Sequence, residues 1–326
     1  MTGAVAVVTD STASLPAAQA RSCYVAVVPL RLLAGDLVAD DEDAGTVAIE
    51  QAVARGERLT TARPSPGLFA AAYRAAADAG ASAVLSVHLS RRLSGTVSSA
   101  EQAAASSPIP VRVVDARTIG LGLGLAVLAA AAAAGAGQGA DEAAATTMRY
   151  AERIGSFFAI DAPDALLAGG RLTGGRLVSG PVAGGPVAGG LVAGGPVAGG
   201  PVAGGPVAGA SASAGAWAGP PQAALVVRTI MQIRSGQIVT VDRVRTRAAA
   251  AASLVGLASE FAGRQPVDVG VQHTAAADRA ADLAERLAAS IPQIRRVYLV
   301  EAGLAIRAHT GPGMLGVTVA PHTTGR

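Results

Sequence analysis

Residues 83–96 read AVLSVHLSRRLSGT. The first seven form a short, mostly apolar run, which is typical of a strand buried on both faces. A helical pattern begins at about Val97, so Ser94, Gly95 and Thr96 lie where the carboxyl end of a strand meets the amino end of a helix. Open α/β sheets bind their ligands at that edge. The stretch therefore predicts an α/β fold with a ligand site at this turn.

Two interpretations of the turn are open. Gly95 lets a backbone approach closely, and the hydroxyls of Ser94 and Thr96, with the free N–H groups of the first helical turn, suit an anion. Alternatively, Ser94 or Thr96 simply caps the helix. The rest of the chain favours the anion site.

Strand and helix patterns alternate through the first half of the chain. This order indicates a three-layer α/β/α domain with a parallel sheet, which we place at residues 1–160. The predicted strands cover residues 5–8, 24–30, 83–89 and 111–115, and the helices cover 69–79, 97–105 and a long stretch from about 122.

The second half has a different pattern, with a hairpin expected at Ser235-Gly236. Hairpins combined with helical crossovers indicate a two-layer α/β domain with a mixed sheet, which we place at residues 161–326. The predicted strands cover residues 156–160, 223–233, 237–244, 267–272 and 293–300, and the helices cover 142–154, 246–261 and 275–289.

A low-complexity insert interrupts the second domain. From Val182 to Gly209 the unit Val-Ala-Gly-Gly-Pro repeats almost perfectly. Gly-Gly-Pro cannot sustain a helix or a central strand, and the unit has too little apolar surface to offset the entropy of ordering. We therefore expect a flexible insert over residues 178–219.

The composition narrows the possible function classes. The 326 residues suffice for two domains, and the net charge is only +3. No basic run with interleaved aromatic residues is present in the sequence, so we expect no nucleic-acid partner. Cys23 is the only cysteine, which excludes a disulfide framework and a cysteine metal site within the chain. We expect no metal and no cofactor.

The sequence also bears on the cellular location. Residues 119–136 carry no charge, but they are mainly Ala and Gly, which favours a helix packed against a sheet over a membrane span. Residues 1–6 lack a positive region and Asp10 soon follows, which indicates a first strand and not a signal peptide. We expect a cytoplasmic protein without an integral membrane span, which leaves transient membrane contact open.

Five further residues carry polar groups that could bind an anion. Thr61 and Arg63 lie in a loop with two prolines, whose other interpretation is ordinary turn chemistry. Arg171 follows a glycine pair and is either an anion anchor or a solvated charge. His273 follows a predicted strand and could equally be a structural histidine. His309 begins the glycine-rich turn His-Thr-Gly-Pro-Gly, which is either a tight turn or the wall of a site.

The order of these motifs resembles the DegV family of fatty-acid-binding proteins. The resemblance extends over nearly the whole chain, apart from the repeat insert and its flanks. The matching stretches are VVTDSTASLP at residues 7–16, VPL at 28–30, the Thr61 loop with Pro64-Ser65, LSGT at 93–96, VDAR at 114–117, GGRL at 169–172, VRT at 244–246 and HTGPG at 309–313.

The resemblance implies a function as well as a fold. Proteins of this family hold a fatty acid between an N-terminal α/β/α domain and a C-terminal α/β domain, and some present it to a separate fatty acid kinase that makes acyl-phosphate. By motif, the carboxylate ligands map to Thr61, Ser94, Arg171 and His273. Gly95, Thr96, Arg63 and His309 are the supporting residues, and none is catalytic. The family has Gln where this chain has Arg63.

Two other functions are weighed against the fatty-acid carrier. An enzyme of the dihydroxyacetone-kinase-like type, acting on a small phosphorylated substrate, would have a similar fold. The sequence contains no Walker loop and no obvious nucleophile–base pair for it. A structural role led by the repeat insert is the third possibility. We expect a lipid-binding carrier and not an enzyme.

Overall fold

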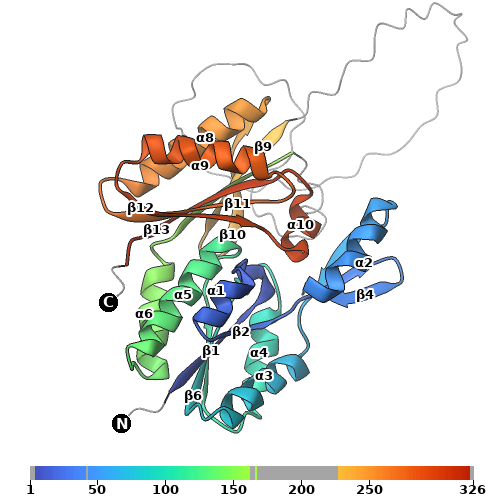
Figure 1. Ribbon diagram of the computed structural model, residues 1–326, viewed down its shortest axis with the longest axis vertical. Helices are drawn as coiled ribbons and strands as arrows, with labels where there is room; N and C mark the ends of the chain where they lie inside the picture. Colours follow the sequence, from blue (N-terminus) through green and yellow to red (C-terminus); the bar gives the residue numbers. More distant parts are fainter. Residues whose placement is uncertain (1–3, 42, 162–165, 167–226, 324–326) are drawn as a thin grey trace, which may run out of the picture. The chain divides into compact units, whose positions relative to one another are not determined.

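The computed structural model describes residues 4–41, 43–161, 166 and 227–323, which belong to one compact unit (Figure 1). Two α/β domains make up this unit, and each has a sheet of its own. The first is a three-layer α/β/α domain with a parallel sheet, and the second is a two-layer domain with a mixed sheet, as predicted. The repeat insert and Arg171 lie outside the described residues.

The sheet of the first domain contains four parallel strands in the order β2-β1-β6-β7. Each strand was predicted from its apolar run, and β1 and β6 occupy the buried centre. The strands are β1 (Val5–Asp10), β2 (Val25–Val28), β6 (Ala83–His88) and β7 (Val111–Asp115).

Helices cover both faces of this sheet. Because successive side chains of a strand point to opposite faces, Val7 and Val8 of β1 enter different cores. Val8 packs with Phe69 and Tyr73 in the core on one face of the sheet. Val7 belongs to the core on the opposite face. The covering helices are α3 (Pro66–Asp78) and α4 (Thr96–Ala104) on the first face, and α1 (Ala17–Ser22), α5 (Leu121–Gly135) and α6 (Ala140–Ala151) on the second.

The sheet of the second domain has six strands in the order β10-β9-β8-β13-β11-β12. All neighbouring pairs are antiparallel except β11 and β12. Helices α8 and α9 pack on one face. The elements are β8 (Gly155–Ile160), β9 (Arg228–Arg234), β10 (Gln237–Val244), β11 (Val267–His273), β12 (Ile294–Glu301), β13 (Leu315–Pro321), α8 (Arg247–Ala262) and α9 (Ala277–Ser290).

Two details of this sheet bear on the sequence predictions. The hairpin turn at Ser235-Gly236 is confirmed, with φ values of +48° and +80° that suit a tight two-residue turn. Strand β8 pairs with β9 and β13, so the second sheet begins at Gly155, before the domain boundary that we placed after residue 160.

Helix α5 lies between the two sheets. It contacts β1 and β6 of the first sheet and β11 and β13 of the second. Small residues permit this double contact: a Cβ atom at Gly124 would lie 2.5 Å from the carbonyl oxygen of Ala13, and one at Gly122 would lie 2.7 Å from the hydroxyl oxygen of Ser156. The prediction of a closely packed helix is confirmed, and none of the helices in the described ranges is both long and apolar enough to cross a bilayer.

A third, smaller sheet was not predicted. Its strands pair antiparallel in the order β4-β3-β5, and Leu32, Ile49 and Leu304 join its core. Helices α2 and α10 pack against it. These elements are β3 (Arg31–Ala34), β4 (Leu37–Asp40), β5 (Leu59–Ala62), α2 (Asp43–Ala54) and α10 (Leu304–Thr310).

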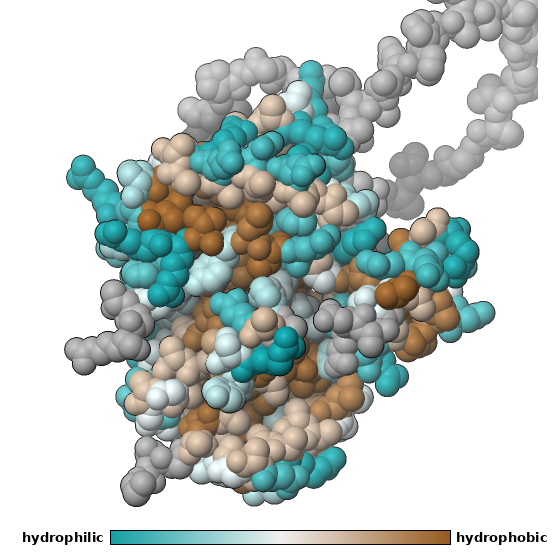
Figure 2. Space-filling model, viewed as in Figure 1, coloured by the Kyte–Doolittle hydropathy of each residue, from teal (hydrophilic) through white to brown (hydrophobic). Residues whose placement is uncertain are grey.

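Apolar side chains remain exposed along one edge of the second sheet. β12 is the outer strand there, and its Val297 and Leu299 are 46% and 48% exposed. Figure 2 shows hydrophobic atoms gathered on the face where this strand lies. This edge is therefore a hydrophobic surface outside the core.

Candidate functional site

A cavity of about 930 Å³, counted with its opening to solvent, lies between the two domains. Its walls are mainly hydrophobic, and both domains contribute to them. Sites for small molecules typically have this apolar character. The apolar lining includes Leu89, Leu93, Phe157, Ile233, Ile306 and Met314.

Polar side chains join this lining, and those of the predicted site residues come from three separate segments. Thr61 lies in β5 and Arg63 follows that strand, Ser94 lies in the turn before α4, and His309 lies in α10. Thr61 and Ser94, which the sequence analysis placed at one ligand site, do line the same cavity. The lining thus has a few polar groups among many apolar ones. This arrangement is expected of a site for a ligand with a polar end and an apolar chain.

Thr61 and His309 contact each other directly. The Oγ1 atom of Thr61 lies 2.8 Å from the Nε2 atom of His309. If Nε2 carries a proton and donates it to Oγ1, the threonine O–H is free to donate to a ligand. The pair can then present a hydrogen-bond donor to an anion in the cavity.

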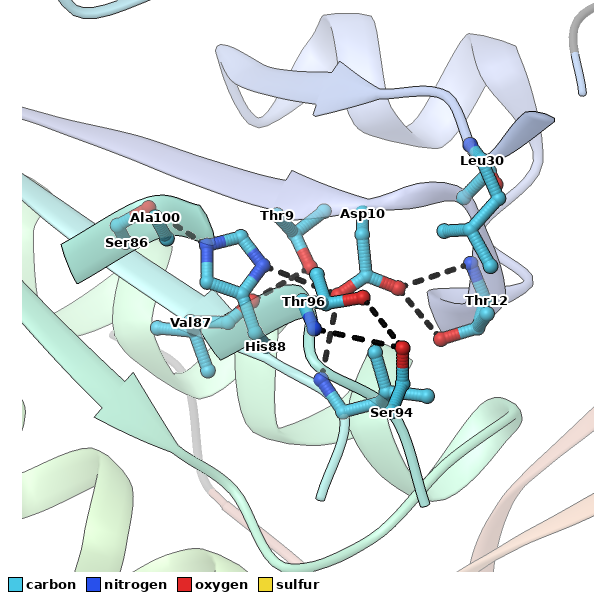
Figure 3. A network of polar contacts seen from close by, with 12 residues as sticks. Thr9, Asp10, Thr12, Leu30, Ser86, Val87, His88, Ser94, Thr96 and Ala100 are labelled. Atoms are coloured by element: carbon cyan, nitrogen blue, oxygen red, sulfur yellow. Dashed lines mark hydrogen bonds and ion pairs between the residues drawn. The ribbon is translucent and has the colours of Figure 1, made fainter. Parts of the chain in front are cut away.

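The turn before α4 holds Ser94 in place. The hydroxyl oxygen of Ser94 accepts a hydrogen bond from the N–H of Thr96 at 3.3 Å and lies 2.9 Å from the hydroxyl oxygen of Thr96 (Figure 3). Thr96 is fully buried, so it supports Ser94 from behind. The helix begins after Gly95, and no side chain caps it. The capping interpretation is therefore incomplete, because Ser94 both binds the turn and lines the cavity.

Gly95 and Arg63 are structurally linked. We expected Gly95 to let the backbone approach a ligand, but the space that a Cβ atom would fill there is taken by the Nη1 atom of Arg63. Arg63 is exposed and lines the cavity, so its guanidinium lies where the cavity meets solvent. An arginine in such a place can attract an anion.

His273 does not line the cavity. It is buried at the end of β11, where its Nδ1 atom accepts a hydrogen bond from the N–H of Ala276 at 3.4 Å. The imidazole that lines the cavity belongs to His309, and a ligand role for His273 stays a prediction. The His-Thr-Gly-Pro-Gly motif was the signal that pointed to it, although His309 and Thr310 end a helix and do not begin a turn.

A fully buried network that the sequence analysis did not predict lies behind the cavity (Figure 3). Asp10 accepts hydrogen bonds from the N–H and the O–H of Thr12, at 3.1 and 2.5 Å, through its Oδ1 atom. Its Oδ2 atom accepts from His88 Nδ1 at 3.0 Å and from the N–H of Leu89 at 3.2 Å. Thr12 in turn lines the cavity, so this carboxylate orients a residue of the cavity wall.

The network continues from His88 away from the cavity. The Nε2 atom of His88 lies 2.7 Å from the hydroxyl of Ser86, which lies 2.9 Å from the hydroxyl of Tyr73. Burial raises the pKa of Tyr73 to about 12. Ser86, His88 and Asp10 thus form a nucleophile–base–acid series like that of hydrolases. However, Ser86 is fully buried and does not line the cavity, so it is not placed to attack a substrate there.

The segment that carries His309 is anchored by Asp41. The carboxyl group of Asp41 accepts hydrogen bonds from the Ser11 hydroxyl and from the N–H groups of Leu304 and Ala305, at the start of α10. Burial nevertheless raises the pKa of Asp41. The Ser11 hydroxyl also accepts from the N–H of Leu30 at 3.0 Å, which ties the first domain to the small sheet.

Comparison with known proteins identifies the family of the chain. Residues 4–181 and 214–322 match the model of a family described as "Uncharacterised protein, DegV family". The chain belongs to the DegV family. The resemblance inferred from the motifs is thereby confirmed.

Two relatives match this DegV chain over nearly its whole length. It is 36% identical to a DegV domain-containing protein of Streptomyces coelicolor, over 97% of this chain and 98% of that protein. It is 31% identical to a DegV domain-containing protein of Mycobacterium tuberculosis, over 97% of this chain and 96% of that protein.

Solved DegV structures share the fold. A DegV family protein from Thermus thermophilus, described as binding fatty acid, superimposes with a TM-score of 0.76 and 27% identity, over 98% of this chain and all of that one. DegV of Bacillus subtilis, described as a fatty acid binding protein, has a TM-score of 0.76 and 24% identity, over 98% of this chain and all of that one. At 24% identity the second similarity shows the fold alone.

Proposed function

We propose that this DegV protein binds a long-chain fatty acid in the cavity between its two domains. The observation that carries the proposal is that Thr61, Ser94 and His309, from three distant parts of the chain, line a single apolar cavity. In this proposal Thr61 and Ser94 donate hydrogen bonds to the carboxylate, and His309 holds the Thr61 hydroxyl. Arg63 stands at the opening and adds a positive charge.

The two parts of a fatty acid match the two kinds of lining. Burial of the acyl chain provides the larger driving force: about 14 methylenes at ~0.8 kcal/mol each amount to ~11 kcal/mol before the costs of association. The carboxylate needs hydrogen-bond donors when it leaves water, and the hydroxyls and the arginine can supply them. The acyl chain therefore sets affinity, and the polar group sets orientation and selects acids over other lipids.

Similarity to the Thermus thermophilus protein supports the ligand class, because that protein is described as binding fatty acid at 27% identity. The family match favours this function over a dihydroxyacetone-kinase-like enzyme. Arg171, which the family resemblance also assigns to the carboxylate, stays part of the proposal as a prediction.

The finer part of the proposal is that the protein is a cytoplasmic carrier without catalytic activity of its own. It would present the bound carboxylate to a fatty acid kinase, which transfers a phosphoryl group to form acyl-phosphate. The exposed Arg63 at the cavity opening would face the incoming phosphoryl donor and offset the added negative charge.

Two measurements test the two parts separately. Native mass spectrometry of the protein purified from a bacterial host should show a co-purified acyl chain, and protein stripped of lipid should take up oleate. Failure of both would overturn fatty-acid binding. Acyl-phosphate should then form only when a fatty acid kinase and ATP are added to the loaded protein. Turnover of ATP by the protein alone would support the enzyme alternative.

A further inference from the structure

The tip of the β9–β10 hairpin lies past the part of β9 that pairs with β8. Strand β8 pairs with β9 only over residues 229–232, so the cross-strand pair Ile233 and Ile238 lies past the end of that ladder. Both isoleucines are buried and both line the cavity. The hairpin tip is therefore a part of the cavity wall that the β8–β9 ladder does not hold, although both isoleucines pack in the hydrophobic core.

One buried side-chain hydrogen bond joins this tip to the first domain. The hydroxyl of Ser90 donates to the carbonyl oxygen of Gly236 at 2.7 Å, and Ser90 is fully buried. Gly236 has a φ of +80°, and a Cβ atom there would meet the Ser90 hydroxyl. The close approach of the two domains at this point thus depends on a glycine.

Ser90 belongs to the same turn as Ser94. The carbonyl oxygen of Ser90 accepts hydrogen bonds from the N–H groups of Leu93 and Ser94, at 2.9 and 3.2 Å, and its hydroxyl oxygen accepts from the N–H of Arg92 at 3.2 Å. A movement that releases the hairpin tip therefore acts on the turn that positions Ser94 at the cavity.

We propose that the hairpin tip opens and closes the cavity, so that the fatty acid is loaded and released there; we call this tip the latch. The hydrogen bond from Ser90 to Gly236 holds the tip closed, and we call it the catch. In the closed state Ile233 and Ile238 cover the acyl chain, and Ser94 is held in its binding position. When the catch opens, the isoleucine pair leaves the cavity and the Ser94 turn loses a neighbour, so release of the carboxylate accompanies release of the chain. The inference rests on the proposed fatty-acid binding and adds its regulation.

A reversible disulfide tests the latch. A Cβ atom at Gly236 would lie 3.3 Å from the Cβ atom of Ser90, close to the spacing of about 3.8 Å found in disulfides. The variant S90C/G236C is made with C23A, so that these are the only two thiols, and it is studied reduced and oxidised. S90C/C23A and G236C/C23A are the controls, since each has one thiol and cannot form the lock.

The readout is transfer of radiolabelled oleate between the protein and phosphatidylcholine vesicles. Oleate added before oxidation should stay trapped, and oleate added after oxidation should stay outside, while the reduced protein exchanges in both orders. Equal exchange by oxidised and reduced protein would overturn the latch but leave fatty-acid binding intact. Loss of oleate in both orders would mean a damaged site and would also count against the latch. Absence of binding by the wild type would overturn both proposals.

If the disulfide does not form, a second variant still tests the proposed role of the hairpin tip. S90A removes the catch without adding a side chain at Gly236. S90A also removes the hydroxyl acceptor of the Arg92 N–H, and loss of the hydrogen bond between the domains should speed oleate release by about two- to tenfold. An unchanged release rate in S90A would overturn the proposal.

Discussion

The hydroxyl oxygen of Thr61 lies 2.8 Å from Nε2 of His309, although 248 positions separate the two residues in the chain. The small sheet and α10 produce this contact, because Leu304 of α10 packs into the same core as Leu32 of β3, the neighbour of the strand that holds Thr61. The polar end of the cavity thus depends on a hydrophobic core that lies outside it.

Replacement of Thr61 by valine tests its role directly. Valine keeps the shape and removes the hydroxyl, so the carboxylate would lose a donor. Because a hydrogen bond to a charged group contributes about 1.5–3 kcal/mol, we expect oleate affinity to fall about ten- to hundredfold by titration calorimetry. Thr60→Val is the matched control, since Thr60 lies on the exposed face of the same strand. An equal effect in both variants would contradict the assignment.

The contact between Gly95 and Arg63 predicts non-additive substitutions. Alanine at Gly95 would displace the Arg63 guanidinium, so G95A and R63Q should each weaken oleate binding, and the double variant should be no weaker than the worse single one. Gly67→Ala is the control, because a Cβ atom there meets nothing closer than the Ser65 hydroxyl at 3.7 Å. Additive losses in calorimetric titrations would show that the two residues act independently.

The buried network predicts a graded loss of stability. His88→Leu leaves the Asp10 carboxylate buried without its imidazole partner, which should cost about 3–5 kcal/mol in the free energy of unfolding. Tyr73→Phe removes only the last hydroxyl of the network and should cost about 1 kcal/mol. Urea unfolding measures both. Similar losses in the two variants would argue against a special role for the Asp10–His88 pair.

Asp41 predicts a specific pH dependence of stability. Because burial raises its pKa, the folded protein keeps a proton on Asp41 at pH values where the unfolded chain has released it. The stability contributed by this proton is present at low pH and is lost as the pH rises through the raised pKa. The stability of D41N should therefore not fall in this way as the pH rises. Above the raised pKa of Asp41, D41N should be more stable than the wild type.

Urea unfolding at a series of pH values measures this difference. Asp40→Asn is the control, since the Asp40 side chain is 43% exposed and lies 3.7 Å from Arg31. A D41N profile that falls as steeply as the wild-type profile would rule out Asp41 as the titrating group.

The long elements were predictable because their patterns are long. The apolar runs that became β1, β6 and β7 and the helix α5 were recognised from sequence alone. The small sheet was missed because β3, β4 and β5 have four residues each and none is apolar throughout, unlike the four-residue β2, which was recognised from its continuous apolar run. Helix α10 was missed because it has only seven residues and ends before Gly311.

The candidate site shows the same division. Ser94 and His273 were both predicted from their places after strands, and of the two only Ser94 lines the cavity, where His309 is the histidine present. The Asp10–His88 pair depended on register: β1 pairs with β6 with Val8 beside Ser86, which brings the ends of both strands together. Which strands lie side by side is set by the strand order of the sheet. The periodicity of apolar residues in the sequence does not reveal that order.

The glycines of α5 have a consequence for protein engineering. Glycine-to-alanine changes inside helices usually raise stability by up to about 1 kcal/mol, because alanine has the higher helix propensity. In this helix a methyl group at position 124 would press on the Ala13 carbonyl, and one at 122 would press on Ser156, so the usual route to a more heat-resistant variant would drive the layers apart. Glycine, a poor helix former, is thus the residue that allows helix α5 to pack between the two sheets.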